Sequence, residues 1–313
     1  MKLSQFVVGV DGGGTKTTAI IADLKGTILA EHVAGPSNVQ TIGVVKAAGV
    51  VFSLIRDCCD SVDSLPKNIK AITIGLAGAG RPDDTKKISE ALRRLASSKN
   101  VRLRKIRIES DARIALEGAF NGGAGIILIA GTGSIAFGKD EKGDIHRVGG
   151  WGRILGDEGS GFFIGKQALT VVCRHLDGRS LSTTLTAIIA KKFGLRTSAD
   201  IITAIYKKDF NIASIAPLVF DAMEKGDAAA SEIVQHASNE LTEHVRALTM
   251  KFQDGSEKGS GRRISLSFIG GLIDHETPLT QSLRRQISNL FPNIDVVAPK
   301  SPPAYGAVLM ALA

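Results

Sequence analysis

A run of glycines directly behind an apolar segment constrains this chain more than any other feature. The apolar segment spans residues 6–10, and the loop after it consists of Asp11, Gly12, Gly13, Gly14, Thr15 and Lys16. A tight turn of glycines lets backbone N–H groups approach a phosphate closely, and a carboxylate beside a hydroxyl can hold a metal ion. A plain hairpin turn is the alternative, because Asp-Gly and Gly-Gly pairs are also strong turn signals.

A second copy of this pattern favours phosphate binding over a plain turn. Residues 125–130 and 135–138 are largely apolar, and the loop between them consists of Gly131, Thr132, Gly133 and Ser134. In both copies the second strand runs into a turn that begins with Asp and ends with Lys-Gly, at 23–26 and at 140–143. A repeated plan of strand, loop and strand predicts two related units, each with its own glycine loop.

The size and composition of the chain agree with two ordinary globular units. The chain has 313 residues, of which 43% are hydrophobic and 22% charged, and this length corresponds to about two domains. No apolar run approaches the ~20 residues of a membrane-spanning helix, and the segment after Lys2 is too short for a signal peptide. We therefore expect a cytoplasmic protein without a membrane partner. Cys58, Cys59 and Cys173 form no Cys-x-x-C pair, which indicates reduced, buried thiols.

The formal net charge of +8 raises the question of nucleic-acid binding. The densest group of basic residues consists of Lys86, Lys87, Arg93, Arg94, Arg102, Arg104, Lys105 and Arg107. This group has no interleaved aromatic residues and no recognition motif, both of which nucleic-acid-binding surfaces commonly show. We interpret it as a solvated face that also helps to attract anionic ligands, and we expect no nucleic-acid partner.

Helical and strand patterns alternate along the chain, which predicts an α/β fold. Behind the first hairpin, the patterns predict helices at 42–56, 83–97 and 111–120 and strands at 71–76 and 101–108. Behind the second hairpin, the region 161–253 is mostly helical, with breaks near Gly178, Gly194 and Gly226, which indicates an inserted group of helices. The chain then continues with a solvated loop at 255–261, strands at 264–269 and 294–297, and helices at 279–290 and 304–312.

Seven short motifs occur in order along the chain. They are Asp11-Gly-Gly-Gly-Thr15, Ser110-Asp111, Gly131-Thr-Gly-Ser134, Gly149-Gly-Trp-Gly152, Leu155-Gly-Asp-Glu-Gly-Ser160, Gly270-Gly271 and Pro303-Ala-Tyr-Gly306. Together they resemble the N-acetylglucosamine kinase group of the BadF/BadG/BcrA/BcrD ATPase family, within the superfamily of actin, sugar kinases and Hsp70 chaperones. The resemblance implies two ribonuclease-H-like (actin-like ATPase) domains around a nucleotide cleft. The expected domains are 1–120 and 121–302, the second with the helical insertion, and the last helix, 303–313, is expected to pack on the first domain.

The resemblance also implies roles for the glycine loops. Asp11 would hold Mg²⁺ through water, and the hydroxyl of Thr15 would approach the transferring phosphate of ATP. The expected nucleotide-binding residues are Gly12, Gly13, Gly14, Thr15, Lys16, Gly131, Thr132, Gly133, Ser134, Gly270 and Gly271. For Gly270 and Gly271, a helix cap or a plain turn is the alternative.

Asp111 is the expected general base. It follows a predicted strand and precedes a predicted helix, so its carboxylate would lie at the carboxyl end of the strand, where ligands of α/β sheets bind. Taken alone, Ser110-Asp111 is typical of a helix N-cap. Its place in the ordered set of motifs favours the catalytic role.

A sugar pocket is expected from a second group of residues. Trp151 is the single tryptophan of the chain and lies between glycines without apolar context, so we interpret it as a wall of this pocket. The resemblance adds sugar-binding roles, and the full expected set is Asn38, Ala77, Gly78, Asp111, Gly150, Trp151 and Asp157. Glu158 would either support this site or only provide a negative charge at a helix N-terminus. His236 and His244 are expected to face solvent on an amphipathic helix.

The resemblance predicts an ATP-dependent kinase that phosphorylates the 6-hydroxyl of an amino sugar. N-acetylglucosamine, glucosamine and N-acetylmuramic acid all remain open as substrates. The alternative within the family is an ATPase that activates a partner enzyme, like the 2-hydroxyacyl-CoA dehydratase activators, which hold an iron–sulfur cluster through paired cysteines that this chain lacks. A sugar kinase of the ROK type would carry a clustered Cys/His zinc motif, which is also missing. The family further implies a homodimer.

Overall fold

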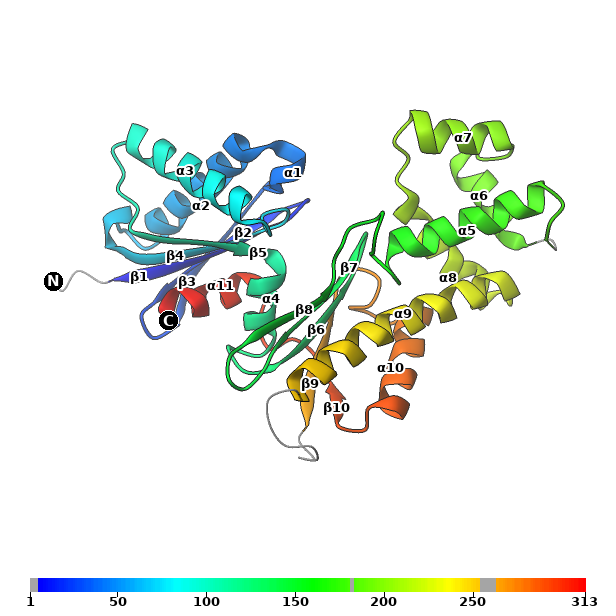
Figure 1. Ribbon diagram of the computed structural model, residues 1–313. Coiled ribbons are helices and arrows are strands. Elements are labelled where there is room, and N and C mark those ends of the chain that lie inside the picture. The colour runs from blue at the N-terminus through cyan, green and yellow to red at the C-terminus, as the bar shows by residue number, and fades with distance from the viewer. Residues whose placement is uncertain (1–4, 181–182, 254–262) are drawn as a thin grey trace. The chain divides into compact units, whose positions relative to one another are not determined.

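The computed structural model describes residues 5–180, 183–253 and 263–313. The predicted loop at 255–261 lies outside these residues. The chain forms two compact units: unit 1 consists of Met1–Ala124 and Ala298–Ala313, and unit 2 of Gly125–Val297. Each unit is an α/β structure built on one five-stranded sheet (Figure 1).

The sheet of unit 1 has the strand order β3-β2-β1-β4-β5. Its strands are β1 (Phe6–Gly12), β2 (Thr17–Asp23), β3 (Ile28–Ala34), β4 (Ile69–Leu76) and β5 (Lys105–Ser110). The first three strands form antiparallel hairpins, whereas β4 and β5 run parallel to β1. The central strand β1 is buried on both faces, which explains why residues 6–10 read as an uninterrupted apolar run.

Helices cover both faces of the sheet of unit 1 (Figure 1). They are α1 (Val39–Ile42), α2 (Val44–Ser61), η1 (Pro66–Asn68), α3 (Pro82–Ser98), α4 (Asp111–Ala119) and α11 (Pro303–Leu312). The apolar sides of helices α2 and α3 pack against one face of the sheet, which includes Val8 and Ile72. Helix α11, the red helix of Figure 1, packs Val308 against Val7 of the opposite face. Alternate residues of β1 therefore belong to different cores.

Unit 2 repeats the same sheet topology. Its strands are β6 (Gly125–Ala130), β7 (Ser134–Lys139), β8 (Ile145–Gly149), β9 (Ile264–Ile269) and β10 (Ile294–Val296). The order is β10-β9-β6-β7-β8, with β6, β7 and β8 antiparallel and with β9 and β10 parallel to β6. Read from the other edge, this is the order of unit 1. The repeat predicted from the two glycine hairpins is confirmed, and so is the two-domain α/β fold class.

The helices of unit 2 share one hydrophobic core with its sheet. They are α5 (Gly161–Leu176), α6 (Thr184–Phe193), α7 (Ser198–Lys207), η2 (Ile212–Ile215), α8 (Ala216–Glu224), α9 (Ala228–Gln253) and α10 (Pro278–Leu290). Three predicted breaks between helices are confirmed. Gly178, Gly194 and Gly226 all have positive φ and lie just behind α5, α6 and α8, where a glycine ends a helix without steric cost.

Two elements of unit 1 differ from the prediction. The helix expected at 42–56 is divided into α1 and α2 at Gly43, whose φ of 80° breaks the helical path. The strand expected from residue 101 begins only at Lys105, because residues 101–104 approach the sheet without pairing with β4.

The three cysteines are free thiols. Cys58 and Cys59 are buried on α2 as expected, whereas Cys173 is only half-buried on α5 and corrects that expectation. Within the described ranges, the helices are too short or too polar to cross a lipid bilayer.

Close packing of α11 on α4 yields a test of the fold. A Cβ atom added to Gly306 would lie inside van der Waals contact of the Ile114 carbonyl oxygen and of the Gly118 backbone. We expect Gly306→Ala to lower the free energy of unfolding by about 1 to 3 kcal/mol, as overpacking of a core typically does. Urea unfolding followed by circular dichroism measures this loss.

The matched control is Gly49→Ala on α2, where an added Cβ meets nothing within 4 Å. Alanine there should raise stability, since it exceeds glycine in helix propensity by about 1 kcal/mol. Equal stability of the Gly306→Ala variant and the parent would contradict the packing of α11 described above.

Candidate functional site

The first glycine loop connects β1 to β2 at the carboxyl end of β1. The Gly13 N–H donates to the Lys16 carbonyl over 2.9 Å, which closes the hairpin. Gly14, Thr15 and Lys16 are exposed, and an added Cβ on Gly14 would meet nothing within 4 Å. Within the described part of the chain, the N–H groups of Gly14 and Thr15 have no hydrogen-bond acceptor. The tip of the loop therefore offers free backbone donors of the kind that bind phosphate.

Two other segments of unit 1 are held against the first loop. The carbonyl oxygen of Gly13 accepts hydrogen bonds from the N–H groups of Ser37, over 3.0 Å, and Asn38, over 3.1 Å. The Ala77 N–H donates to the Gly12 carbonyl over 2.8 Å. Gly12 itself has no room for a side chain, because an added Cβ would collide with Ser37 and with Leu76. The structure thus brings the first loop together with Asn38 and Ala77, two of the residues expected to contact a sugar.

Asn38 and Gly78 are connected through a residue that the sequence analysis missed. The Asn38 side chain caps α1, and its Oδ1 atom accepts the Gln40 N–H over 2.9 Å. The Gln40 side chain in turn donates to the Gly78 carbonyl over 3.1 Å. Its place two residues behind Asn38, in the first turn of α1, is the sequence signal that could have identified Gln40. Together these bonds fix the two segments expected to contact a sugar.

Asp111 is the first residue of α4, directly behind β5. The N-cap is Ser110, whose hydroxyl accepts the Arg113 N–H over 3.1 Å. The Oδ1 atom of Asp111 accepts the Ala112 N–H over 2.8 Å. Asp111 therefore is not the capping residue, and its carboxylate keeps free acceptor positions at the same edge of the sheet as the first loop.

Asp11 and Asp111 influence each other electrostatically. The pKa of Asp11 is raised to about 6. Burial is the larger cause and the charge of Asp111 the smaller one, while the charge of Lys16 acts in the opposite direction. Burial also raises the pKa of Asp111, against the effect of its hydrogen bond from Ala112. Asp111 as a residue is exposed to solvent, but the protein around its carboxyl group disfavours the charged form. We refer to Asp11–Lys16, Asn38, Ala77, Gly78 and Asp111 as the first cluster.

The donor chemistry of the first cluster fits Mg²⁺. A bound cation would relieve the repulsion between the carboxylates of Asp11 and Asp111. Among the described residues, no group of three or more His, Cys, Asp or Glu side chains could enclose a metal ion. Magnesium does not require such a cage, since it usually keeps several waters and binds one or two carboxylates together with substrate phosphates.

The second glycine loop, at the end of β6 in unit 2, is held by hydrogen bonds within the loop and from α5. The Gly131 N–H donates to the Gly133 carbonyl over 2.9 Å. The first turn of α5 donates back to the loop, from Gly161 N–H to Gly131 carbonyl over 2.8 Å and from Phe162 N–H to Thr132 carbonyl over 3.1 Å. These bonds give the loop one defined backbone conformation.

The glycine pair at the end of β9 lies beside the second loop. Gly270 has a φ of 98°, and an added Cβ would lie 2.5 Å from the Ala130 carbonyl oxygen. The Leu272 N–H donates to the same carbonyl over 3.2 Å. Gly271 is exposed, with nothing within 4 Å of an added Cβ. The pair forms a turn, as the alternative interpretation holds, and its bare backbone also leaves room for a ligand.

Asp157 lies directly over the second loop. Its Oδ1 atom accepts a hydrogen bond from the Ser134 N–H over 3.3 Å. A Cβ atom added to Gly133 would lie 2.8 Å from the same oxygen. Burial raises the pKa of the Asp157 carboxyl. The Ser134 hydroxyl donates to the Glu158 carbonyl over 2.6 Å. These contacts fix the segment that contains Asp157 and Glu158 to the second loop.

Trp151 is exposed, with 71% of its surface accessible. Its indole ring lies 5.5 Å from the Arg147 guanidinium, which also donates to the Gly150 carbonyl over 2.5 Å. The Gly150 N–H donates to the Ser134 carbonyl over 3.1 Å. Trp151 is therefore outside the core, as predicted. We refer to Gly131–Ser134, Gly150, Trp151, Asp157, Gly270 and Gly271 as the second cluster.

His244 corrects the sequence analysis. His236 is exposed on α9 as expected, but His244 is buried. Its Nδ1 atom lies 2.8 Å from the Glu240 carbonyl oxygen, and its Nε2 atom has no hydrogen-bond partner among the described residues and lies 3.9 Å from Glu158 Oε2. An added Cβ on Gly149 would collide with the imidazole ring. His244 thus supports the Gly149–Glu158 segment from beneath.

The helical spacing of α9 explains the error and could have prevented it. Leu241, Val245 and Leu248 are fully buried and form one face of the helix. Position 244 lies three residues behind Leu241 and next to Val245, on this same face.

Known proteins resemble this chain over nearly its whole length. The model of the BadF/BadG/BcrA/BcrD ATPase family matches residues 8–311. The chain belongs to this family. The matched residues include both clusters.

Individual relatives cover almost the whole chain. An N-acetylmuramic acid/N-acetylglucosamine kinase of Clostridium acetobutylicum is 33% identical over 310 residues, 98% of each chain. An N-acetyl-D-glucosamine kinase of Dictyostelium discoideum is 30% identical, again over 98% of each chain. A crystal structure of a Chromobacterium violaceum protein, described as a proposed N-acetylglucosamine kinase, is 26% identical with a TM-score of 0.75 and covers 99% of this chain and 100% of that one.

The raised pKa of Asp11 predicts a pH-dependent cost in stability. Its pKa of about 6 exceeds the ordinary value of 3.8, so the folded state binds more protons than the unfolded state between these values. The free energy of unfolding therefore falls as pH rises through this window. We expect Asp11→Asn to unfold at a higher urea concentration than the parent at pH 7.5. The gain in the free energy of unfolding should be on the order of 1 to 3 kcal/mol, and it should be smaller near pH 4.

The control for this prediction is Asp23→Asn. Asp23 is exposed, and the hydrogen bond from the Thr27 N–H, followed by that from Lys25, lowers its pKa. Its removal should reduce stability at neutral pH, the opposite sign. A destabilised Asp11→Asn variant at pH 7.5 would contradict the desolvated environment described for Asp11.

Proposed function

We propose that this protein is an ATP-dependent amino-sugar kinase, which transfers the γ-phosphoryl group of ATP to the 6-hydroxyl of N-acetylglucosamine or a close relative. One observation carries the proposal. Two carboxylates with raised pKa, Asp11 and Asp111, lie at the carboxyl ends of β1 and β5 beside an open glycine loop. The two curated relatives that are 30% or more identical, over nearly their whole length, are both named as amino-sugar kinases.

The first cluster would hold the phosphates and the metal. The free N–H groups of Gly14 and Thr15, the Thr15 hydroxyl and the Lys16 ammonium are donors for phosphate oxygens. Asp11 would hold Mg²⁺ through its water shell, because a single carboxylate leaves most positions of the octahedron to water and phosphate. Bound Mg²⁺ neutralises charge on the phosphate oxygens. In the second cluster, Gly131–Ser134 and the bare backbone of Gly270 and Gly271 would contact the nucleotide.

Asp111 would act as the general base. As the sugar oxygen attacks the γ-phosphorus, the bond to the leaving ADP oxygen breaks, and the hydroxyl proton passes to a free carboxylate oxygen of Asp111. A raised pKa brings this carboxylate nearer to the working pH, which favours proton acceptance in the transition state. The raised pKa of Asp11 means that its ionised form is costly beside Asp111. A bound cation would lower that cost.

The remaining predicted residues would contact the sugar. Asn38, Ala77 and Gly78 lie next to the first loop through the Gly13 and Gln40 hydrogen bonds. Gly150, Trp151 and Asp157 lie in one segment attached to the second loop. The exposed indole of Trp151 offers an apolar face of the kind that packs on a sugar ring. The Asp157 carboxylate can accept hydrogen bonds from sugar hydroxyls. We also propose a cytoplasmic homodimer, as the family resemblance implies.

The activator alternative requires thiolate ligands for an iron–sulfur cluster. Burial raises the pKa of Cys58 to about 12 and that of Cys59 to about 11. Both thiols lie in the core of unit 1 on α2, so they are not exposed at a surface where a cluster shared between two subunits could bind. The cysteines of this chain therefore favour the kinase.

Sugar-dependent release of ADP tests the proposal. We expect N-acetylglucosamine, glucosamine or N-acetylmuramic acid to raise ADP production well above the hydrolysis background, because a positioned hydroxyl reacts faster than water. Asp111→Asn should lower kcat by ~10²-fold or more, the range of a general base, while its unfolding midpoint does not fall. A coupled ADP assay with a panel of free and N-acetylated sugars measures both effects.

The matched control is Asp83→Asn, which removes an exposed carboxylate from the first turn of α3. Its kcat should equal that of the parent. If no amino sugar raised ADP production and a protein partner did, the activator would replace the kinase. If Asp111→Asn kept full activity, another group would be the base.

A further inference from the structure

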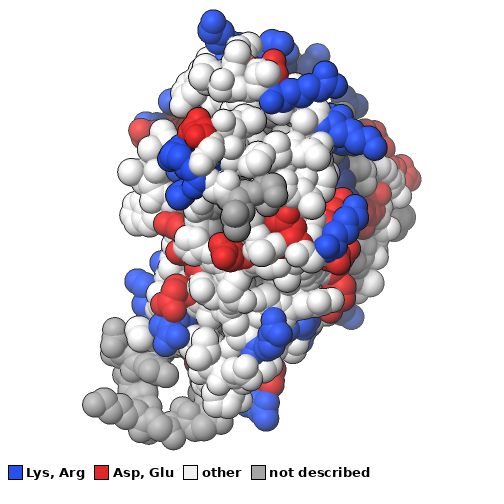
Figure 2. Space-filling view, turned by 90° about the vertical axis from the view of Figure 1, so that its right-hand side faces the viewer, with Lys and Arg blue, Asp and Glu red and all other residues white. Residues whose placement is uncertain are grey.

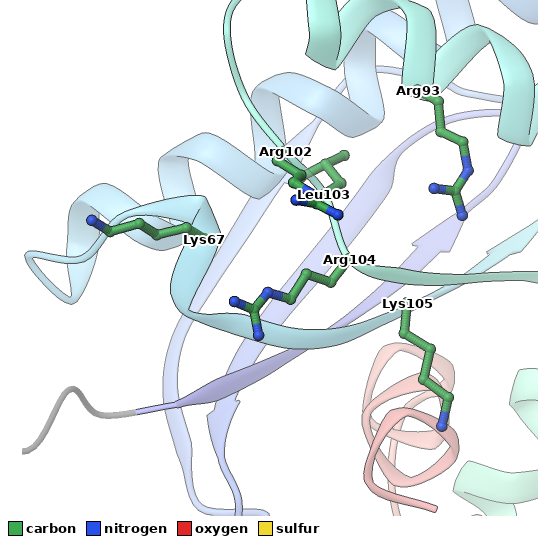
Figure 3. A pocket seen from close by; sticks show the side chains of 6 residues that line it. All are labelled: Lys67, Arg93, Arg102, Leu103, Arg104 and Lys105. Atoms are coloured by element: carbon green, nitrogen blue, oxygen red, sulfur yellow. The ribbon is translucent and has the colours of Figure 1, made fainter.

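A basic cavity lies in unit 1 apart from both clusters. It has a volume of about 470 Å³ and is lined by Lys67, Arg93, Arg102, Leu103, Arg104 and Lys105 (Figure 3). Its residues come from three segments: η1, helix α3 and the stretch that leads into β5. We refer to it as the basic cavity.

The basic cavity lies at the opposite end of the strands from the first cluster. Lys105 is the first residue of β5, and Lys67 precedes β4. Asp111 follows the last residue of β5, six strand residues further on, which corresponds to roughly 20 Å at about 3.3 Å per residue. A ligand in the basic cavity therefore would not occupy the phosphate-binding positions of the first loop.

The charges of the basic cavity are not balanced locally. Five of the six lining residues are cations, and none is acidic. In the described part of the chain, none of these five side chains forms an ion pair or a hydrogen bond. Their neighbours Arg94 and Arg107 do pair, with Glu90 and Glu109. On the face shown in Figure 2, by contrast, basic and acidic side chains are interspersed.

The two central arginines of the basic cavity flank a buried leucine. Leu103 is buried, whereas Arg102 and Arg104 on either side of it are exposed. All three line the cavity, together with Arg93 and Lys67 (Figure 3). The leucine thus anchors this segment to the core of unit 1, while the two arginines beside it stay accessible to a ligand.

We propose that the basic cavity binds a small molecule with two or more phosphate groups. Guanidinium groups match phosphate oxygens in a planar, two-point geometry, and five cations of one sign attract a multiply charged anion. The volume lies within the ordinary range for small-molecule sites. The lining contains a single apolar residue and no aromatic one, so the ligand is compact and polar, and the stacking of bases that single-stranded nucleic acid requires is not provided.

Titration calorimetry with inorganic pyrophosphate tests this site. Mg²⁺ and nucleotide are left out, because ADP itself carries two phosphate groups and would compete for the basic cavity, and because the first loop then lacks the cation that would help it to hold phosphates. We expect the parent protein to bind pyrophosphate at one site, and Arg102→Gln/Arg104→Gln to bind it at least ten-fold more weakly. The control Lys86→Gln/Arg94→Gln removes the same net charge from α3 outside the lining, and it should bind as the parent does.

Three outcomes would overturn the proposal. The first is that the parent does not bind pyrophosphate. The second is equal weakening in both double variants, which indicates only a general effect of net charge. The third is that a DNA duplex binds more tightly than pyrophosphate and loses affinity in Arg102→Gln/Arg104→Gln to the same extent. Unchanged unfolding midpoints of the variants show that the fold is intact. Because the readout is binding in place of turnover, failure here is distinct from failure of the kinase.

Discussion

The parallel pairing of β1, β4 and β5 is the constraint on which the first cluster depends. Asp11 of β1 is in register with Gly75 of β4, which in turn is in register with Glu109 of β5. Parallel strands end at the same edge of a sheet, so the segments behind all three strands meet there. The same pairing brings Asp11 and Asp111 close enough to repel each other in a partly desolvated place. The fold thus creates a local cost that a cation and phosphates can offset.

The second sheet has the same topology but treats its loop differently. In unit 1 the tip of the first loop is open around Gly14, whereas in unit 2 the carbonyls of the second loop accept hydrogen bonds from α5. Asp157, with a φ of 59°, lies against Gly133, where a side chain would leave no room for it. The two loops therefore differ in what holds them: Ser37, Asn38 and Ala77 donate to the first loop, whereas the first turn of α5 donates to the second.

The sequence predicted best what depends on local chemistry. The central strands, the glycine loops and the helix breaks follow from apolar runs and from glycines that take a positive φ. The edge strands β3 and β8 were not predicted, because residues such as Glu31 and Arg147 are exposed on them and dilute the strand pattern. The hydrogen bond from Gln40 to Gly78 was missed because it depends on how distant segments pack. The burial of His244 was missed although the spacing of apolar residues on α9 contained a local signal for it. The roles of the individual site residues stay predictions.

Carbon-13 NMR titration of the aspartate carboxyl groups tests the central claim most directly, since it observes the coupling between Asp11 and Asp111 itself. The Asp11 resonance is assigned by its loss in Asp11→Asn. In the ligand-free protein, we predict a pKa of about 6 for Asp11, and a lower value in Asp111→Asn, because the repulsive charge is removed. An Asp11 pKa near 3.8, or one that does not change when Asp111 is replaced, would contradict the account.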